Sequence, residues 1–141
     1  MAADSSKQPV YPDRRDTAVA SYSPALEVGD FVFVSGQGPL NFESLKFECS
    51  TIESQTQRTL ENVKKVLAAA DCRMEDVVKI SIFLQNINDF EQVDAIYQQY
   101  FSKPWPARTT VQAILGAGIS IEIDAIAVRG CGTPFDQTVV V

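Results

Sequence analysis

The sequence predicts a single α+β domain in which two helices lie on one face of a mixed β-sheet. The 141 residues are enough for one domain with one hydrophobic core. Runs with a two-residue hydrophobic period alternate with two runs of helical period, in the order β-β-α-β-α-β-β. Helices and strands mixed in this way form layers around a shared core, which is the basis of the α+β assignment.

The ends of the chain differ in composition from its middle. Residues 1–17 are polar and contain prolines, so we expect a flexible N-terminal arm. Residues 18–130 form the predicted domain, and residues 131–141 form a C-terminal extension. The extension closes with Val139 to Val141, which are suited to an added strand or to packing on a neighbouring subunit.

The first two predicted strands precede the first helix. Ala20 to Leu26 is a short candidate strand, and Pro24 places it at an edge of the sheet. Gly29 and Asp30 form a turn into the strand Phe31 to Gln37. The segment from Gly38 to Cys49 is expected to be a loop or an irregular hairpin.

The first helix is predicted from Ser50, which forms a capping box with Glu53. Its apolar stripe is made by Ile52, Thr56, Leu60, Val63, Leu67 and Ala70. The next strand is Val77 to Gln85, with Val78, Ile80, Ile82 and Leu84 assigned to one face.

The second helix is predicted from a cap at Asn88 with Glu91. It carries Phe90, Val93, Tyr97, Tyr100 and Phe101, of which Tyr97, Tyr100 and Phe101 are expected in the core. Lys103-Pro104-Trp105-Pro106 ends it, because proline cannot continue a helix. Strands at Ala107 to Leu115 and Ser120 to Arg129 complete the sheet. One helical layer cannot cover both apolar faces of this sheet, so we expect copies of the chain to cover the second face.

Composition excludes several functions. The net charge is −6 and no basic run occurs, which argues against nucleic acid. Histidine is absent, which removes the commonest general base and metal ligand and rules out a Ser-His-Asp triad. No segment has the length and apolarity of a signal peptide core or a membrane helix, so we expect a soluble cytoplasmic protein. The three scattered cysteines are expected to be reduced.

Arg108 at the start of a predicted strand is the first candidate functional residue. Strand alternation places Arg108 and Thr110 on the same face. One interpretation is a surface arginine whose stem packs and whose head stays in water. The other is a guanidinium that holds a carboxylate or phosphate through two parallel hydrogen bonds.

Glu122 is the second candidate, within the strand Ile121 to Val128. Glu122 and Asp124 share a face with Ile126 and Val128, so burial should raise the pKa of such a carboxyl. A carboxyl tuned in this way can carry protons in place of the missing histidine. The alternative is that both acids face solvent on an edge strand or pair with a cation.

A glycine after a strand and a Tyr-Ser pair are weaker signals. In V-S-G-Q the glycine permits a backbone shape that exposes N–H groups to a ligand, although an ordinary turn has the same composition. The motifs are informative together and in order: Y-S-P-A from Tyr22, V-S-G-Q from Val34, Q-T-Q-R-T-L-E-N-V from Gln55, V-V-K-I-S-I-F-L from Val77, N-D-F from Asn88, Y-Q-Q-Y-F from Tyr97, P-A-R-T-T-V from Pro106 and I-E-I-D-A-I-A-V from Ile121.

This ordered set resembles the reactive intermediate deaminase family, RidA (also called YjgF), over about residues 20–130. The resemblance implies a chorismate-mutase-like fold and a homotrimer whose sheets form a central barrel, with active sites between subunits. It implies hydrolysis of small enamine or imino acids such as 2-aminoacrylate to 2-oxo acids and ammonia, with no metal or organic cofactor.

The resemblance also implies roles for individual residues. Arg108 would bind the substrate carboxylate and Glu122 would position or activate the water. Tyr22 would line the cleft, and Ser35 and Gly36 would supply polar contacts.

Two cleft positions depart from the family pattern. Thr110 stands where members often carry cysteine, and Asp94 where better-known deaminases have asparagine. Both are among the expected substrate-binding residues, so the identity of the natural imine substrate stays open. Two other functions stay as alternatives: a non-catalytic trimer that binds 2-oxo or imino acids, which Asp94 favours, and a ribonuclease-type translational inhibitor.

Overall fold

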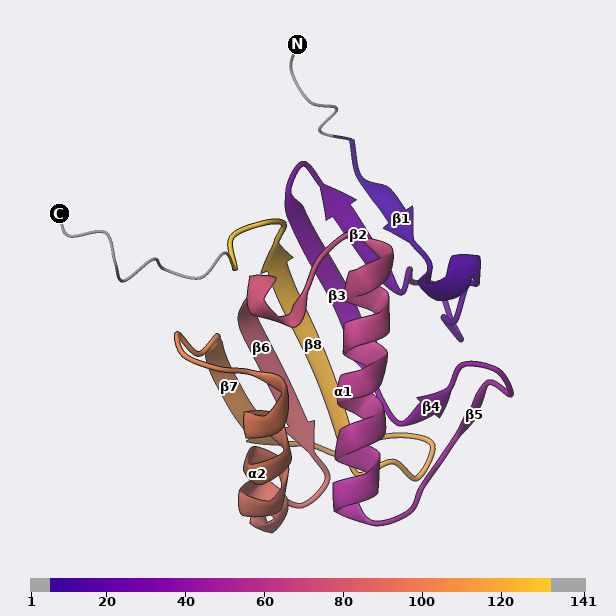
Figure 1. The fold of residues 1–141 in the computed structure, drawn as a ribbon. Coiled ribbons are helices and arrows are strands. Elements are labelled where there is room, and N and C mark those ends of the chain that lie inside the picture. Colours follow the sequence, from indigo (N-terminus) through magenta and orange to yellow (C-terminus); the bar gives the residue numbers. More distant parts are fainter. Residues whose placement is uncertain (1–5, 133–141) are drawn as a thin grey trace, which may run out of the picture.

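A six-stranded mixed sheet carries both helices on one face in the computed structural model, which describes residues 6–132 (Figure 1). Residues 1–5 and 133–141, with the predicted role of Val139 to Val141, lie outside that range. The strands are β1 (Gln8–Val10), β2 (Ala25–Val28), β3 (Phe31–Gln37), β4 (Leu40–Asn41), β5 (Lys46–Phe47), β6 (Val77–Leu84), β7 (Ala107–Gln112) and β8 (Ile121–Val128). The helices are α1 (Ile52–Ala69) and α2 (Phe90–Tyr100).

The order across the sheet is β1-β2-β3-β8-β6-β7. Only β6 and β7 run parallel, because α2 connects them as a crossover, and the other neighbours in this sheet are antiparallel. The chain therefore has the predicted α+β fold, and β4 and β5 form the short hairpin expected between Gly38 and Cys49.

Strand β1 was not predicted from the sequence. Gln8–Val10 pairs with β2, and Val10 is buried, although the predicted element order began only at Ala20. Pro9 and the polar residues near it do not follow a strand pattern. A proline is tolerated in β1 because this strand lies at the edge of the sheet. The strand predicted at Ala20 to Leu26 corresponds to β2, which begins later, at Ala25, and ends at Val28.

The predicted faces of β6 hold except at its start. Ile80, Ile82 and Leu84 are buried beneath the helices, as expected. The assignment of Val78 to that face was wrong: Val77 is buried and Val78 is 41% exposed. A register shift against β8 between Val77 and Lys79 reverses the alternation there.

Both predicted helix caps were misplaced by a residue or two. Thr51 caps α1, because its hydroxyl accepts a hydrogen bond from Ser54 N, and the predicted Ser50 cap lies one residue too early. Before α2, Asn86 caps a short 3-10 turn at Ile87–Asp89, and the helix follows from Phe90.

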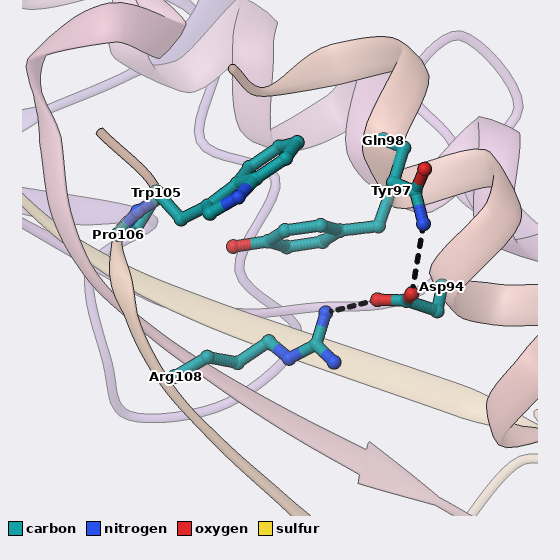
Figure 2. Close-up of a pocket in the computed structure, with 6 residues that line it drawn as sticks. All are labelled: Asp94, Tyr97, Gln98, Trp105, Pro106 and Arg108. Carbon is teal, nitrogen blue, oxygen red and sulfur yellow. Dashed lines mark hydrogen bonds and ion pairs between the residues drawn. The ribbon is translucent and has the colours of Figure 1, made fainter. Parts of the chain in front are cut away.

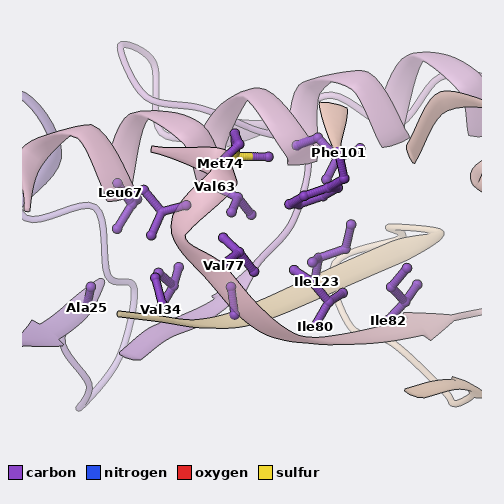
Figure 3. Packing of buried hydrophobic residues seen from close by; sticks show 14 of the residues in the cluster. Ala25, Val34, Val63, Leu67, Met74, Val77, Ile80, Ile82, Phe101 and Ile123 are labelled. Carbon is purple, nitrogen blue, oxygen red and sulfur yellow. The ribbon is translucent and has the colours of Figure 1, made fainter. Parts of the chain in front are cut away.

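The core lies between the helices and the sheet, as Figure 3 shows for residues such as Val63, Leu67, Ile80 and Ile123. Asn62 is a fully buried polar side chain of α1 within it. Its amide donates to the carbonyl oxygens of Gly38 (2.9 Å) and Leu40 (2.8 Å), which fixes the chain just after β3.

The opposite face of the sheet has no helix over it in the described part of the chain. Phe31 and Phe33 stack there with ring centroids 6.2 Å apart and are 50% and 43% exposed. An apolar surface of this kind is what the sequence predicted for the second face. None of the helices within residues 6–132 is long and apolar enough to span a membrane.

Candidate functional site

Arg108 leaves β7 on the helix-covered side of the sheet and reaches α2. Its Nη1 atom donates to Asp94 Oδ1 at 2.7 Å, and its guanidinium lies over the rings of Tyr97 (4.7 Å) and Phe90 (5.2 Å). The side chain is only 20% exposed. The interpretation of Arg108 as a solvated surface arginine is therefore wrong, because its charged head is paired and stacked.

A pocket of about 380 Å³ opens beside this arginine. Its walls are Asp94, Tyr97, Gln98, Trp105, Pro106 and Arg108. Figure 2 shows the Tyr97 ring between the Trp105 indole and the Arg108 guanidinium. The pocket thus combines one cation, one carboxylate and two aromatic rings.

Local structure explains how these side chains meet. Asp94, Tyr97 and Gln98 are spaced i, i+3 and i+4 on α2, so they share one face of the helix. Trp105 and Pro106 lie on the segment that leads from α2 into β7, three and two residues before Arg108. The sequence identified Arg108 and Asp94 but placed Tyr97 only in the core, and it missed Gln98, Trp105 and Pro106 as pocket residues.

The electrostatics of the pocket follow from the ion pair. The hydrogen bond from Arg108 lowers the pKa of Asp94, so this carboxylate is charged at neutral pH. Its other oxygen accepts from Gln98 Nε2 at 3.0 Å. Burial raises the pKa of Tyr97, so the phenol keeps its proton.

Glu122 is half-buried on β8, between the fully buried Ile121 and Ile123. This alternation directs it to the face away from the helices, together with Asp124, as predicted. Desolvation raises the pKa of Glu122, and the nearby charge of Asp124 raises it further. The carboxyl therefore has the raised pKa that the sequence predicted for a proton carrier.

Gly36 lies against Glu122. A Cβ atom added to Gly36 would stand 2.7 Å from Glu122 Oε2, so only glycine admits the carboxylate there. Gly36 and Tyr22 together line a small hollow of about 30 Å³. The Ser35 hydroxyl donates to the Ser23 carbonyl at 2.6 Å and so holds the segment that carries Tyr22.

The predicted site residues thus form two separate groups within one chain. Arg108, Asp94 and Thr110 lie on the helix-covered side, although Thr110 is outside the pocket wall. Glu122, Gly36, Ser35 and Tyr22 gather around β3 and β8. Arg108 and Glu122 project from opposite faces of the sheet, so a single chain does not bring them together.

A metal centre finds no support in the described part of the chain, residues 6–132. No three acidic, cysteine or histidine side chains gather there in a way that could hold an ion.

Many known proteins are similar in sequence to this chain. The family model described as endoribonuclease L-PSP matches residues 13–129. A 2-iminobutanoate/2-iminopropanoate deaminase from Homo sapiens is 37% identical over 114 residues, which cover 80% of this chain and 83% of that protein. A RutC family protein from Pyrococcus abyssi is 35% identical over 124 residues, which cover 87% of this chain and 98% of that protein.

Solved structures show the same fold. RidA from the Antarctic bacterium Psychrobacter has a TM-score of 0.81 and 32% identity, covering 86% of this chain and 98% of that one. TdcF from E. coli, solved with bound serine, has a TM-score of 0.80 and 31% identity, covering 87% of this chain and 99% of that one.

Proposed function

The chain belongs to the RidA/YjgF family, and on that premise we propose that it hydrolyses small enamine and imino acids to 2-oxo acids and ammonia. Relatives that carry the name 2-iminobutanoate/2-iminopropanoate deaminase support this class of substrate. The observation that carries the proposal is the pocket beside Arg108. The Arg108 guanidinium lies over the rings of Tyr97 and Phe90, and Trp105 lines the same pocket.

Arg108 is proposed to bind the substrate carboxylate. One of its nitrogens donates to Asp94, and the fork geometry of a guanidinium leaves further N–H groups for a second carboxylate. Anchoring the acid end of a three- or four-carbon substrate removes most of its rotational freedom. The reacting C2 atom then lies at a fixed distance from the protein, which favours attack by a positioned water.

Glu122 is proposed to serve as the proton carrier. 2-Aminoacrylate first takes a proton at C3 and becomes the protonated imine. A water oxygen then bonds to C2 while the π electrons of the C=N bond move to nitrogen, and Glu122 accepts the water proton. Glu122 returns that proton to nitrogen, the C–N bond breaks, and ammonia leaves. The oxygen lone pair forms the carbonyl, and the ionised Glu122 takes the remaining hydroxyl proton. A carboxyl with a raised pKa suits both transfers.

The two groups of residues require a second copy of the chain to meet. We therefore propose a homotrimer in which the apolar faces carrying Phe31 and Phe33 pack around a central barrel. Arg108, Asp94 and Thr110 of one subunit would then face Tyr22, Ser35, Gly36 and Glu122 of the next. The exposed aromatic pair supports this assembly, because a surface of that kind is rarely left in water.

The test is an assay in which a dehydratase generates 2-aminoacrylate and lactate dehydrogenase reports pyruvate. Added protein should raise the rate above spontaneous hydrolysis, and Arg108→Ala and Glu122→Gln should each lower that gain by about 100-fold. Arg58→Ala is the matched control, because Arg58 also pairs with a carboxylate, Glu48, but lies away from the pocket. No acceleration with this or other imino acids would end the proposal.

A non-catalytic trimer that binds 2-oxo or imino acids is the second candidate. The observation in its favour is the Asp94–Arg108 ion pair, which occupies part of the proposed anchor. Tight binding by calorimetry without turnover of any imine would identify it. The description of the matching family model as endoribonuclease L-PSP favours the ribonuclease interpretation, but the net charge of −6 is unfavourable for binding RNA.

A further inference from the structure

The Asp94–Arg108 ion pair places opposite charges side by side in the wall of one pocket. The Arg108 and Asp94 side chains are 20% and 32% exposed, so both reach the pocket while the protein partly shields them from water. Interactions between charges are stronger in such a place than on an open surface. Any ligand that binds Arg108 therefore also experiences the Asp94 carboxylate.

Tyr97 adds a second unusual feature. Its side chain is 3% exposed, and its ring lines the pocket. Its hydroxyl is close enough to interact with Arg108 but makes no well-formed hydrogen bond with any described residue. In Figure 2 the hydroxyl end points toward the segment that carries Trp105 and Pro106, with the Trp105 ring on one side and Arg108 on the other. A buried hydroxyl without a partner is costly, and a ligand oxygen at this position would relieve that cost.

We propose that Asp94 and Tyr97 make this pocket selective for acids that carry a positively charged nitrogen beside the carboxylate, over 2-oxo acids of the same length. Arg108 and the Tyr97 hydroxyl donate to the ligand carboxylate. Asp94 accepts an N–H from the protonated imino or amino group. The proposal rests on the proposed function in one respect, the assignment of Arg108 as the carboxylate anchor.

Charge balance explains the selectivity. The Arg108–Asp94 pair is neutral as a unit, so a 2-oxo acid adds an uncompensated negative charge close to Asp94. A protonated imino acid is a zwitterion and leaves the pocket neutral, with its cationic end near the carboxylate. The pocket thereby distinguishes substrate from product, because hydrolysis exchanges the charged nitrogen for a neutral carbonyl oxygen.

The experiment compares two stable ligands of equal length by calorimetry at neutral pH: 2-aminobutyrate, a zwitterion, and 2-oxobutyrate, a monoanion. The unmodified protein should bind 2-aminobutyrate about tenfold more tightly. Asp94→Asn should reverse the preference, strengthening 2-oxobutyrate and weakening 2-aminobutyrate by about tenfold each. Neither measurement needs turnover.

Two further variants separate the roles. Glu91→Gln removes a negative charge from an exposed position on the same helix, outside the pocket, and should leave both affinities unchanged. Tyr97→Phe should weaken both ligands by a similar factor, because both carry a carboxylate. The same variant should change the stability of the free protein little, because the hydroxyl that it removes makes no well-formed hydrogen bond there.

Several results would overturn the inference. These are equal binding of the two ligands, binding of neither, or an Asp94→Asn effect of the same size and sign on both. A protein that shows the selectivity but forms no 2-oxo acid from imines supports this inference and refutes the deaminase proposal. A protein that deaminates imino acids but binds the two ligands equally refutes this inference and supports the deaminase proposal.

Discussion

Arg108 and Glu122 lie on opposite faces of one sheet, two strands apart. Arg108 is in register with Ile80 of β6, and Ile80 is in register with Ala125 of β8, three residues beyond Glu122. Strand spacing and rise then separate their backbones by roughly 10 Å across the sheet and about 10 Å along it. If both residues serve one reaction, they must come from different subunits.

Mixed trimers test this arrangement directly. Arg108→Ala and Glu122→Gln should each be inactive alone, but co-refolded mixtures should regain activity. An intersubunit site takes Arg108 from one copy and Glu122 from the next. A random equal mixture therefore has about one quarter of its sites intact, and about one quarter of the unmodified activity is expected.

The control mixture combines the Glu122→Gln variant with a double variant that carries both Arg108→Ala and Glu122→Gln. Such trimers contain no intact Glu122 and should stay inactive. Failure of the first mixture to regain activity, with trimers confirmed by sedimentation, would show that the two residues do not meet across an interface.

Gly36 sets the position of the Glu122 carboxylate. Gly36→Ala would place a Cβ atom 2.7 Å from Glu122 Oε2, and the flexible end of the glutamate would move rather than the backbone. A displaced proton carrier should lower kcat by about tenfold or more, while the denaturation midpoint changes little. Steady-state kinetics and urea unfolding provide the two readouts.

Gly116→Ala is the matched control for Gly36→Ala. A Cβ atom at Gly116 would meet nothing within 4 Å, and its φ angle is not in the left-handed region. This variant should therefore keep full kcat. Equal activity of both variants would remove Gly36 from the site.

The residues that were predictable from sequence share a common property: their placement depends on local periodicity. Alternation correctly put Arg108 with Thr110, and Glu122 with Asp124, because strand geometry fixes the side of each residue. The same rule failed at Val78, where an extra residue against β8 reverses the alternation and no sequence signal marks it.

Contacts between distant segments were not predictable in this way. Asp94 and Arg108 are 14 residues apart on a helix and a strand, and only the packing of α2 on β7 creates their ion pair. Tyr97 was assigned to the core from its helical stripe, which is correct for its ring. Its hydroxyl is a pocket feature only because Trp105 and Arg108 lie beside it. The helical spacing of Asp94, Tyr97 and Gln98 was the one usable signal.

The pH dependence of activity should reveal the state of Glu122. Desolvation, and secondarily Asp124, raise its pKa above the ordinary value of 4.5. As the proton acceptor it must be ionised, so kcat/KM should fall as pH drops through that raised pKa. Asp124→Asn removes the smaller cause and should move this limb to lower pH. An unchanged limb would contradict the role of Asp124.

Stability gives an independent readout of the same carboxyl. Because the folded pKa is raised, the folded state binds more protons than the unfolded state between pH 4.5 and the raised pKa. The contribution of Glu122 to the free energy of unfolding should therefore decrease as pH rises through this window. Glu122→Gln should abolish that part of the pH dependence, measured by urea unfolding at several pH values.

Asn62 should hold the end of β3 through its buried amide. Asn62→Ala removes the hydrogen bonds to Gly38 O and Leu40 O and leaves a cavity at a fully buried position. A loss of about 2–4 kcal/mol in the free energy of unfolding is expected, because buried carbonyl oxygens then lack a donor. Lys64→Ala, at an exposed position on the same helix, should change stability by less than about 0.5 kcal/mol. Urea unfolding measures both, and equal effects of the two variants would show that the Asn62 amide contributes nothing to the fold.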